Sequence, residues 1–412
     1  MYWHLKRVCD VLREALPLIM VKPSREVLPL GETVGYYSAV NVVARVDVPH
    51  YDRSAVDGYA LRAEETSSAS PYNPALFKLI GGIEVGAKPD LSAGPGECVE
   101  VATGAPMPRG ANAVVMLEDT RRRGSLIEVL KPLATWENVS KQGEDLKAGT
   151  LILKQGDRVQ PWHIAALASQ GMDRLEVYAP RIALASTGSE LVEPGWELPP
   201  GRVYNYTGYL IKAWLIESKC RVVYRGLLSD SEDIILEALE EMLKVSDAVI
   251  VTGGTSVGRK DYTVRAVKRL DGLEYLAHGL ALRPGKPTAL AVVDGKPILA
   301  VSGLPVAALA ALDVVFRPVL MHMCQSRLPV TKVKARLARK ISKPPGLLGF
   351  IRVRVYRRGN GLYVEPVRLS GSGVISSLLK GNGILLVEED LEGLEQGEIV
   401  EVELYEEPED LS

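Results

Sequence analysis

The sequence contains little cysteine, and its cysteines form no pattern that indicates a metal site or a disulfide framework. There are four among 412 residues, spread along the chain as Cys9, Cys98, Cys220 and Cys324. No two of them form a C-x-x-C pair. A zinc ribbon, an iron–sulfur site and a secreted disulfide scaffold are therefore not expected.

Histidine is equally sparse and scattered. The chain has five histidines, and none belongs to an H-E-x-x-H motif or a similar metal-binding arrangement. We expect each to occupy an ordinary position in the core or at the surface. They are His4, His50, His163, His278 and His322.

A surplus of charge of one sign is also absent. Lys and Arg number 49 and Asp and Glu number 51, which gives a formal net charge of -2. A chain that coats nucleic acid or an anionic membrane needs a one-sided surplus, so neither partner is expected. The apolar fraction of 47% and the charged fraction of 24% are typical of a globular protein.

The chain has no long hydrophobic run. The longest weakly charged stretch, residues 298–312, is interrupted by Ser302, Gly303 and Pro305 and is too short to span a bilayer. Residues 1–6 indicate the start of an amphipathic helix and not a signal peptide. We therefore expect a cytoplasmic protein without a membrane partner.

Regions that differ in residue pattern predict a multidomain protein of class α/β plus β. Residues 1–48 and 140–178 carry helical periodicity and predict a discontinuous helical linker domain. Residues 49–139, with short strand-like runs, predict a small β-rich domain. Residues 179–325 alternate strand and helix, which predicts a central three-layer α/β domain with a mostly parallel sheet. The alternating pattern of residues 326–412 predicts a C-terminal β-barrel-like domain.

The strongest motif for chemistry is a loop rich in small residues. An apolar strand at residues 249–251 runs into Gly253, Gly254, Thr255 and Ser256. Glycines let a backbone approach an anion closely, and free N–H groups and hydroxyls can then bind it. A phosphate cradle is the functional interpretation, and a tight strand-to-helix turn without a ligand is the alternative.

A second loop, residues 185–191, ends another strand of the same domain and carries Thr187 and Glu190. Ligands of such sheets bind at the carboxyl ends of the strands. Glu190 together with Asp261, which precedes a predicted helix, would hold a hard cation such as Mg²⁺ against a phosphate through oxygen ligands. For either carboxylate alone, a helix cap or a first-turn charge is the alternative.

Three further turns carry polar residues. Residues 283–287 (RPGKP) place Arg283 and Lys286 around rigid prolines, an arrangement suited to an oxyanion. Two loops of the predicted β-rich domain contain Asp57 and Thr103. Without further context, each of these two loops indicates a solvated turn.

In combination, these motifs resemble the MoeA family of molybdopterin molybdenumtransferases, whose eukaryotic relatives include the E domain of gephyrin. The resemblance covers nearly the whole chain. It rests on seven segments in order: residues 52–60, 96–115, 143–152, 183–191, 249–262, 283–287 and 371–383. It implies an insertion reaction in which adenylylated molybdopterin receives molybdate, or tungstate, while its pyrophosphate is cleaved with Mg²⁺ and AMP leaves.

The resemblance also implies residue roles. The residues implied to be catalytic are Asp57, Asp145, Glu190, Asp230 and Asp261, with Glu190 and Asp261 as metal ligands. Those implied to bind the substrate or the oxyanion are Thr103, Thr187, Gly253, Gly254, Thr255, Ser256, Arg283, Lys286, Arg352 and Ser372. Members of the family form elongated dimers, so a homodimer is implied, in which Asp57 and Thr103 would face a second subunit. Other proteins of molybdenum cofactor biosynthesis are candidate partners.

The chain departs from the family pattern at several positions. Ser140, Ser189, Thr207 and Leu304 stand where the family usually has Arg, Asp, Asn and Asn, and Arg283 replaces a common Lys. A paralogue that binds a pterin or nucleotide without catalysis is therefore one alternative. A molybdopterin adenylyltransferase is another, because its single domain resembles residues 180–323, but that family lacks the flanking β domains.

Overall fold

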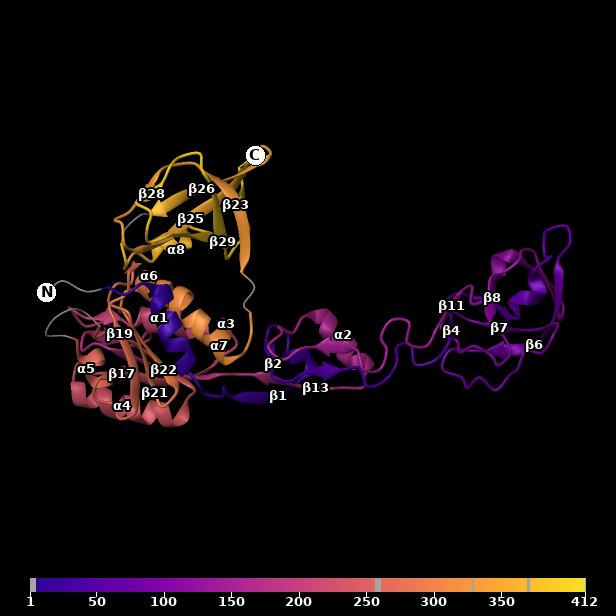
Figure 1. The fold of residues 1–412 in the computed structure, drawn as a ribbon, viewed down its shortest axis with the longest axis horizontal. Coiled ribbons are helices and arrows are strands. Elements are labelled where there is room, and N and C mark those ends of the chain that lie inside the picture. Colours follow the sequence, from indigo (N-terminus) through magenta and orange to yellow (C-terminus); the bar gives the residue numbers. More distant parts are fainter. Residues whose placement is uncertain (1–4, 256–260, 328–329, 369–370, 412) are drawn as a thin grey trace. The chain divides into compact units, whose positions relative to one another are not determined.

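The computed structural model describes residues 5–255, 261–327, 330–368 and 371–411. The chain divides into two compact units, both drawn in Figure 1. The first unit comprises residues 1–40, 155–160 and 174–412, and the second unit comprises residues 41–154 and 161–173.

The centre of the first unit is a six-stranded sheet with the strand order β17–β14–β18–β22–β21–β19. The first four strands are mutually parallel, whereas β21 pairs antiparallel with both of its neighbours. The sheet therefore brings the carboxyl ends of four adjacent parallel strands to one edge. Its strands are β14 Arg181–Thr187, β17 Arg221–Leu228, β18 Ala248–Thr252, β19 Leu273–His278, β21 Ala289–Val293 and β22 Lys296–Val301.

Helices cover both faces of this sheet. Side chains of a strand point alternately to opposite faces, so Ile182 and Leu184 of β14 join one core with α1, α3, α6 and α7, while Ala183 and Ala185 join the other with α4 and α5. The predicted three-layer α/β domain is confirmed (Figure 1). The helices are α1 Val8–Ala15, α3 Tyr206–Glu217, α4 Glu232–Val245, α5 Tyr262–Val267, α6 Pro305–Ala311 and α7 Arg317–Met323.

The first helix differs from the expectation in its place in the fold. Helix α1 ends at Ala15, and Pro17 follows, which cannot continue the hydrogen-bonding pattern of an α-helix. Its residues Val8, Val11 and Ala15 are buried in the α/β core, whereas the sequence pattern predicts them in a linker domain. Most of the remaining regular structure of the predicted linker is extended: β1 Arg25–Pro29, β2 Tyr37–Ser38, β3 Val42–Val43, β12 Leu151–Leu153 and β13 Arg174–Tyr178.

Helices α6 and α7 are joined by a π-helical segment, Leu312–Phe316, into one helical stretch, Pro305–Met323. Pro305 occupies the first turn of α6, where proline is tolerated. By length and composition this stretch is the one helix among the described residues that could cross a membrane, and most of it is buried inside the structure.

The C-terminal part of the first unit is a closed sheet with the order β25–β26–β23–β29–β27, in which β27 pairs with β25 again. This closure confirms the predicted barrel-like domain. The short strand β20, Leu282–Arg283, pairs with β25 from outside the barrel. The elements are β23 Thr331–Leu337, β25 Leu348–Arg358, β26 Gly361–Arg368, α8 Ser376–Leu379, β27 Gly383–Val387, β29 Ile399–Leu404 and β30 Glu409–Asp410.

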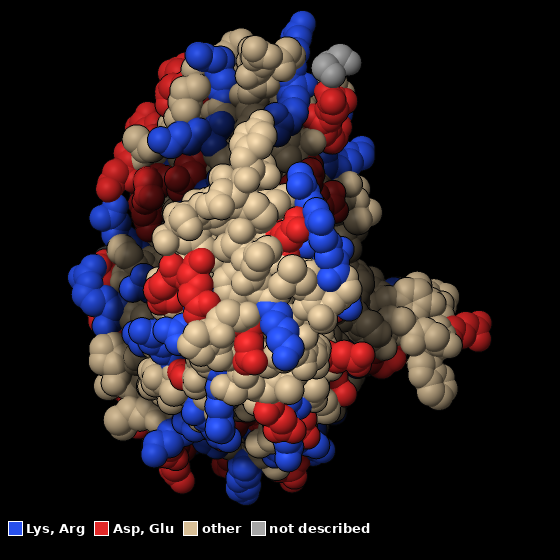
Figure 2. Space-filling view, turned by 90° about the vertical axis from the view of Figure 1, so that its right-hand side faces the viewer, with Lys and Arg blue, Asp and Glu red and all other residues tan. Residues whose placement is uncertain are grey.

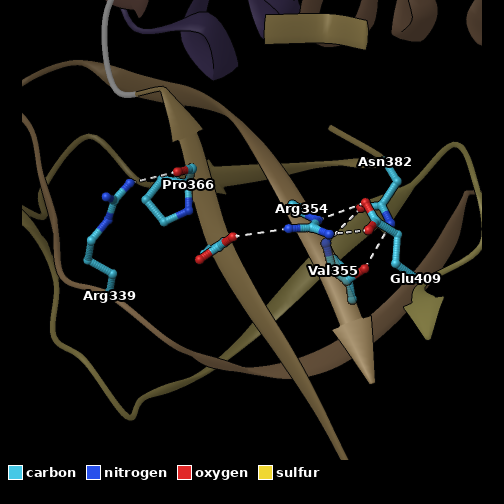
Figure 3. A network of polar contacts seen from close by, with 7 residues as sticks. Arg339, Arg354, Val355, Pro366, Asn382 and Glu409 are labelled. Atoms are coloured by element: carbon cyan, nitrogen blue, oxygen red, sulfur yellow. Dashed lines mark hydrogen bonds and ion pairs between the residues drawn. The ribbon is translucent and has the colours of Figure 1, made fainter. Parts of the chain in front are cut away.

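A polar network fastens the chain end to this barrel (Figure 3). Arg354 Nε donates to Glu409 Oε1 at 2.8 Å. The buried amide of Asn382 accepts from Val355 N at 2.7 Å and donates to Val355 O at 2.8 Å. The side chain of Asn382 thus forms the pair of hydrogen bonds to Val355 that the backbone of a neighbouring strand would otherwise form. Arg339 Nη2 donates to Pro366 O at 2.8 Å.

The second unit contains a six-stranded sheet with the order β8–β5–β7–β6–β10–β9. The unit also contains two separate two-stranded sheets, β4 with β11 and β3 with β12. Its further elements are β4 Arg53–Ser54, β5 Gly58–Leu61, β6 Ala75–Ile83, β7 Glu97–Val101, β8 Ala113–Met116, β9 Thr120–Arg123, β10 Leu126–Val129, β11 Val139–Ser140 and α2 Pro161–Ser169.

The remaining strands are short. They are β15 Leu191–Val192, β16 Val203–Tyr204, β24 Ile341–Ser342 and β28 Gly393–Leu394. On the face drawn in Figure 2, basic and acidic side chains are interspersed, as the balanced composition predicts.

Candidate active site

The two predicted phosphate-binding loops meet at the carboxyl edge of the central sheet, because β14 and β18 are neighbours. A Cβ atom placed on Gly253 would lie 2.3 Å from Thr187 O and 2.6 Å from Thr187 Oγ1. Gly253 and Gly254 have φ values of 97° and 62°, which glycine adopts at little cost. Only glycine therefore allows the two strand ends to approach this closely.

Hydroxyl groups hold the strand-end turns in place. Thr263 Oγ1, from α5, donates to Gly253 O at 3.0 Å, and Thr252 Oγ1 donates to Ser302 O at 3.1 Å. Thr255 is buried, whereas the predicted Ser256 lies outside the described residues. These two hydrogen bonds hold Gly253 and Ser302, the first described residues after β18 and β22, in place.

Asp261 occupies the position before the first residue of α5, but its side chain forms no cap hydrogen bond. The side chain is 17% exposed, and its buried Oδ1 has no hydrogen-bond partner among the described residues. Burial raises the pKa of Asp261, and the attraction of His278, Lys268 and the Val264 N–H only partly opposes this effect. A buried carboxylate oxygen without a partner is rare and suits a ligand of a cation.

His278 is a residue of this site that sequence reasoning missed. Its Nδ1 lies 3.6 Å from Asp261 Oδ2. Strand β19 is antiparallel to β21, which is antiparallel to β22, so the carboxyl end of β19 also lies at the edge of the site. The available signal was the position of His278 at the end of a strand, shortly before the RPGKP turn.

Glu190 and Asp230 lie at neighbouring strand ends. Ser189 N donates to Asp230 Oδ2 at 3.2 Å, and Asp230 N donates to Ser189 Oγ at 3.5 Å. Glu190 is exposed, its carboxylate lies beside Gly188, and the element that follows it is β15 and not a helix. The described residues contain no group of three or more His, Cys, Asp and Glu placed to hold a metal. Mg²⁺ commonly takes only one or two carboxylates together with water and phosphate oxygens, so a site for that ion does not require such a group.

The basic turn and the segment around Ser372 both reach the first turn of α6, which follows β22. Val306 N donates to Ser372 O at 3.0 Å. A Cβ atom on Gly285, between Arg283 and Lys286, would lie 3.6 Å from Ala307 O. Arg283 is half-buried and Lys286 is exposed. The structure thus brings the RPGKP turn and Ser372 to the same helix end.

Arg352 is a fully buried cation in the barrel. Its Nε donates to Ser377 Oγ at 3.2 Å, and its partner across β25 and β26 is Arg368. Burial, and then the charge of Arg368, lower the pKa of Arg352. Two adjacent guanidinium groups favour a bound anion, because an anion would offset their repulsion.

In the second unit, Asp57 and Thr103 form a pair. Asp57 Oδ1 accepts from Thr103 N at 2.7 Å and from Thr103 Oγ1 at 3.0 Å, and these two bonds lower the pKa of Asp57. Asp145 is exposed, and its N–H donates to Val48 O at 3.0 Å. These three predicted residues lie in the second unit, and the other described site residues lie in the first.

The residues that depart from the family pattern have local roles. Ser140 donates a short hydrogen bond to Glu144. Thr207 Oγ1 donates to Gly303 O at 2.7 Å and so ties α3 to the turn after β22. Leu304 lies against Gly373, with 3.2 Å between its Cδ2 and the Cβ position of that glycine.

Comparisons with known proteins match this architecture along most of the chain. Residues 4–171 match the MoeA N-terminal region (domain I and II), residues 183–322 match a probable molybdopterin binding domain, and residues 334–405 match the MoeA C-terminal region (domain IV). The chain is 31% identical over 406 residues to the molybdopterin molybdenumtransferase of Staphylococcus epidermidis, covering 97% of each chain. It is 32% identical over 379 residues to that of Staphylococcus aureus, covering 92% of this chain and 90% of the relative.

Solved structures of related proteins have the same fold. Two crystal structures of the molybdopterin biosynthesis MoeA protein of Pyrococcus horikoshii superpose with TM-scores of 0.85 and 0.83 at 31% and 32% identity. The superpositions cover 98% and 97% of this chain and 100% of those chains.

An α/β domain with glycine-rich strand-end loops, flanked by a β-rich region and a closed barrel, is the architecture of a transferase that acts on molybdopterin. The chain belongs to the MoeA family of molybdopterin molybdenumtransferases, which act in molybdenum cofactor biosynthesis.

Proposed function

We propose that this chain inserts molybdate or tungstate into adenylylated molybdopterin, with cleavage of the pyrophosphate and release of AMP. The observation that carries the proposal is the buried Oδ1 of Asp261, which has no hydrogen-bond partner among the residues that the structure describes, shortly after Gly253 and Gly254 in the chain. Glycine N–H groups suit the pyrophosphate, and the carboxylate suits a cation bound to it.

In this proposal the residues of the chain bind and orient the substrate. Gly253, Gly254 and Thr255 hold the pyrophosphate together with Thr187. Asp261 and Glu190 would hold Mg²⁺, which would neutralise charge on the phosphate oxygens. Asp230 orients the turn after β14 through Ser189 N. By resemblance to the family, Asp57, Thr103 and Asp145 would also contribute, with Asp57 and Thr103 facing a second subunit.

The incoming oxyanion is proposed to interact with the cations around α6 and in the barrel. Arg283 and Lys286 flank Gly285, which lies near Ala307 O of α6. Arg352 and Arg368 are cross-strand neighbours, and Ser372 bonds to the first turn of α6. Molybdate and tungstate are both tetrahedral dianions, so this set of cations suits either one.

AMP release from adenylylated molybdopterin, with Mg²⁺ and either oxyanion, tests the proposal. We expect release that the oxyanion stimulates, and Asp261→Asn should lower its rate by at least about a hundredfold, as loss of a charged catalytic group commonly does. Tight binding without release would instead indicate a non-catalytic paralogue. Formation of adenylylated molybdopterin from ATP would indicate an adenylyltransferase, against which the matched N-terminal and C-terminal regions argue.

We further propose that the protein is a cytoplasmic homodimer that receives its substrate from other proteins of molybdenum cofactor biosynthesis. The outer side of α3 supports an interface, because Tyr209 and Ile216 are 45% and 56% exposed. Light scattering coupled to size-exclusion chromatography should give twice the mass of the 412-residue chain, and a monomer mass at micromolar concentration would refute the dimer.

A further inference from the structure

The segment that carries Glu190 ends at a second carboxylate, Glu193. Strand β15 lies between the two and pairs with β16, where Val203 N donates to Glu190 O at 3.0 Å and Asn205 N donates to Val192 O at 2.9 Å. Side chains of an extended segment alternate between two sides, so residues three positions apart point to opposite sides. Glu190 is exposed, whereas Glu193 is half-buried. The segment thus presents one carboxylate to solvent and directs the other into the domain.

Glu193 is bonded to two different elements of the α/β domain. Its Oε1 accepts a short hydrogen bond from the hydroxyl of Tyr224, in β17, and a second from Asn205 Nδ2 at 3.3 Å. Asn205 Nδ2 also donates to the hydroxyl oxygen of Tyr224 at 2.8 Å. Asn205 is 2% exposed and caps α3, because its Oδ1 accepts from Gly208 N at 3.2 Å. These contacts fasten the segment to β17 and to the first turn of α3.

The protonation of Tyr224 keeps this arrangement intact. Burial, and then the hydrogen bond and charge of Glu193, raise the pKa of Tyr224. The phenol therefore remains a donor to Glu193 at every pH near neutrality. The other carboxylate oxygen, Glu193 Oε2, is buried and forms no hydrogen bond among the described residues, which is rare for such a group.

We infer that Glu193 is a positioning residue, which holds the Glu190 segment against Tyr224 and Asn205 and so keeps the Glu190 carboxylate in place after β14. The inference rests on the proposed function, in which Glu190 holds Mg²⁺. Without these contacts the segment would populate other conformations, and apparent affinity falls in proportion to the fraction of molecules competent to bind. Saturating Mg²⁺ would shift the segment back to the competent conformation.

The Mg²⁺ dependence of AMP release by the full chain tests this role. Tyr224→Phe removes one donor to Glu193, and Glu193→Ala removes both hydrogen bonds. We expect each variant to raise the half-saturating Mg²⁺ concentration about tenfold, as for loss of a hydrogen bond to a charged group, with the rate at saturating Mg²⁺ within about twofold. The control is Tyr204→Phe, which removes a hydroxyl bond from β16 to Trp196 O and should change neither value.

Glu193→Gln separates positioning from charge. Its amide oxygen can still accept from Tyr224 and Asn205, so the half-saturating Mg²⁺ concentration should stay within about threefold of that of the unaltered chain. A shift as large as that of Glu193→Ala would show that Glu193 acts through its charge. A lower maximal rate of Tyr224→Phe at an unchanged half-saturating concentration would show a purely structural role. Either result would overturn the inference.

Hydrogen exchange, measured without Mg²⁺ or substrate, gives a readout that does not need activity. The N–H groups of Leu191, Val203 and Asn205 donate the backbone hydrogen bonds of the segment. They should exchange about tenfold faster in Glu193→Ala than in the unaltered chain, because local opening becomes more frequent, and unchanged exchange would overturn the inference. A chain that releases no AMP would refute the proposed function, whereas the exchange rates would still show whether Glu193 holds the segment.

Discussion

Replacing Asp261 by Asn should remove activity and at the same time stabilise the fold at neutral pH. Asp261 is 17% exposed, and its Oδ1 has no partner among the described residues. Burial raises the pKa of Asp261 above its usual value, so the folded state binds this proton more tightly than the unfolded state. The stability that this carboxyl contributes is full below the unfolded pKa and is lost as the pH rises through the folded pKa. A neutral amide does not incur that loss.

The size of the effect follows from the contacts. A buried acceptor without a partner costs about 1–3 kcal/mol. The amide keeps a polar oxygen at this position but removes the desolvated charge, whose cost exceeds the opposing attraction of His278 and Lys268. We therefore expect the free energy of unfolding to rise by about 1 kcal/mol, at the lower end of that range. For a domain of this size that corresponds to a rise in Tm of about 2–4 °C.

Differential scanning calorimetry at about pH 7.5 and about pH 4 measures the gain in stability and its dependence on pH. The difference in Tm between Asp261→Asn and the unaltered protein should become smaller as the pH falls, because the carboxyl of Asp261 takes up a proton and loses its charge. A variant that is less stable than the unaltered protein at pH 7.5, or a difference in Tm that does not depend on pH, would refute the reasoning.

Three further substitutions test separate parts of the structure. Gly253→Ala places a Cβ atom 2.3 Å from a backbone oxygen of β14 and should cost at least about 2 kcal/mol, whereas Gly31→Ala, with open space around it, should be nearly neutral in the same thermal denaturation. Thr103→Val removes the hydroxyl bond to Asp57 and should raise the pKa of that carboxyl, which NMR titration can follow; an unchanged pKa would contradict the role of the hydroxyl. Asn382→Ala leaves two buried backbone groups unpaired and should destabilise the barrel by about 2–4 kcal/mol, measured by urea unfolding.

Features that depend on local pattern could be predicted from the sequence. The strands at 181–187 and 248–252 are apolar runs followed by glycine, and both termini of such a segment can be read without knowing the fold. Parallel pairing then places their loops together, as the contact between Gly253 and Thr187 shows. The alternating residues of the barrel strands are local signals of the same kind.

Features that depend on long-range packing could not be predicted. Helix α1 has a clear apolar spacing, but that spacing does not specify which core it joins, and Val8 and Val11 proved to be buried in the α/β core. Strand β19 is antiparallel to β21, and β21 is antiparallel to β22, so β19 runs in the same direction as β22. Only this arrangement brings His278, at the end of β19, close to Asp261. Neither a lone histidine nor its neighbours in sequence carry that information.

The loss of one carboxylate at position 189 is consistent with the proposed chemistry. Ser189 and Asp230 exchange hydrogen bonds, so an aspartate at position 189 would place a second negative charge beside Asp230. Its absence leaves Glu190, Asp230 and Asp261 as the carboxylates that follow β14, β17 and β18. Fewer carboxylates weaken the hold on a free cation, but they also reduce repulsion of a pyrophosphate and an oxyanion. A site of this kind should bind Mg²⁺ mainly together with the phosphate, as is usual for that ion.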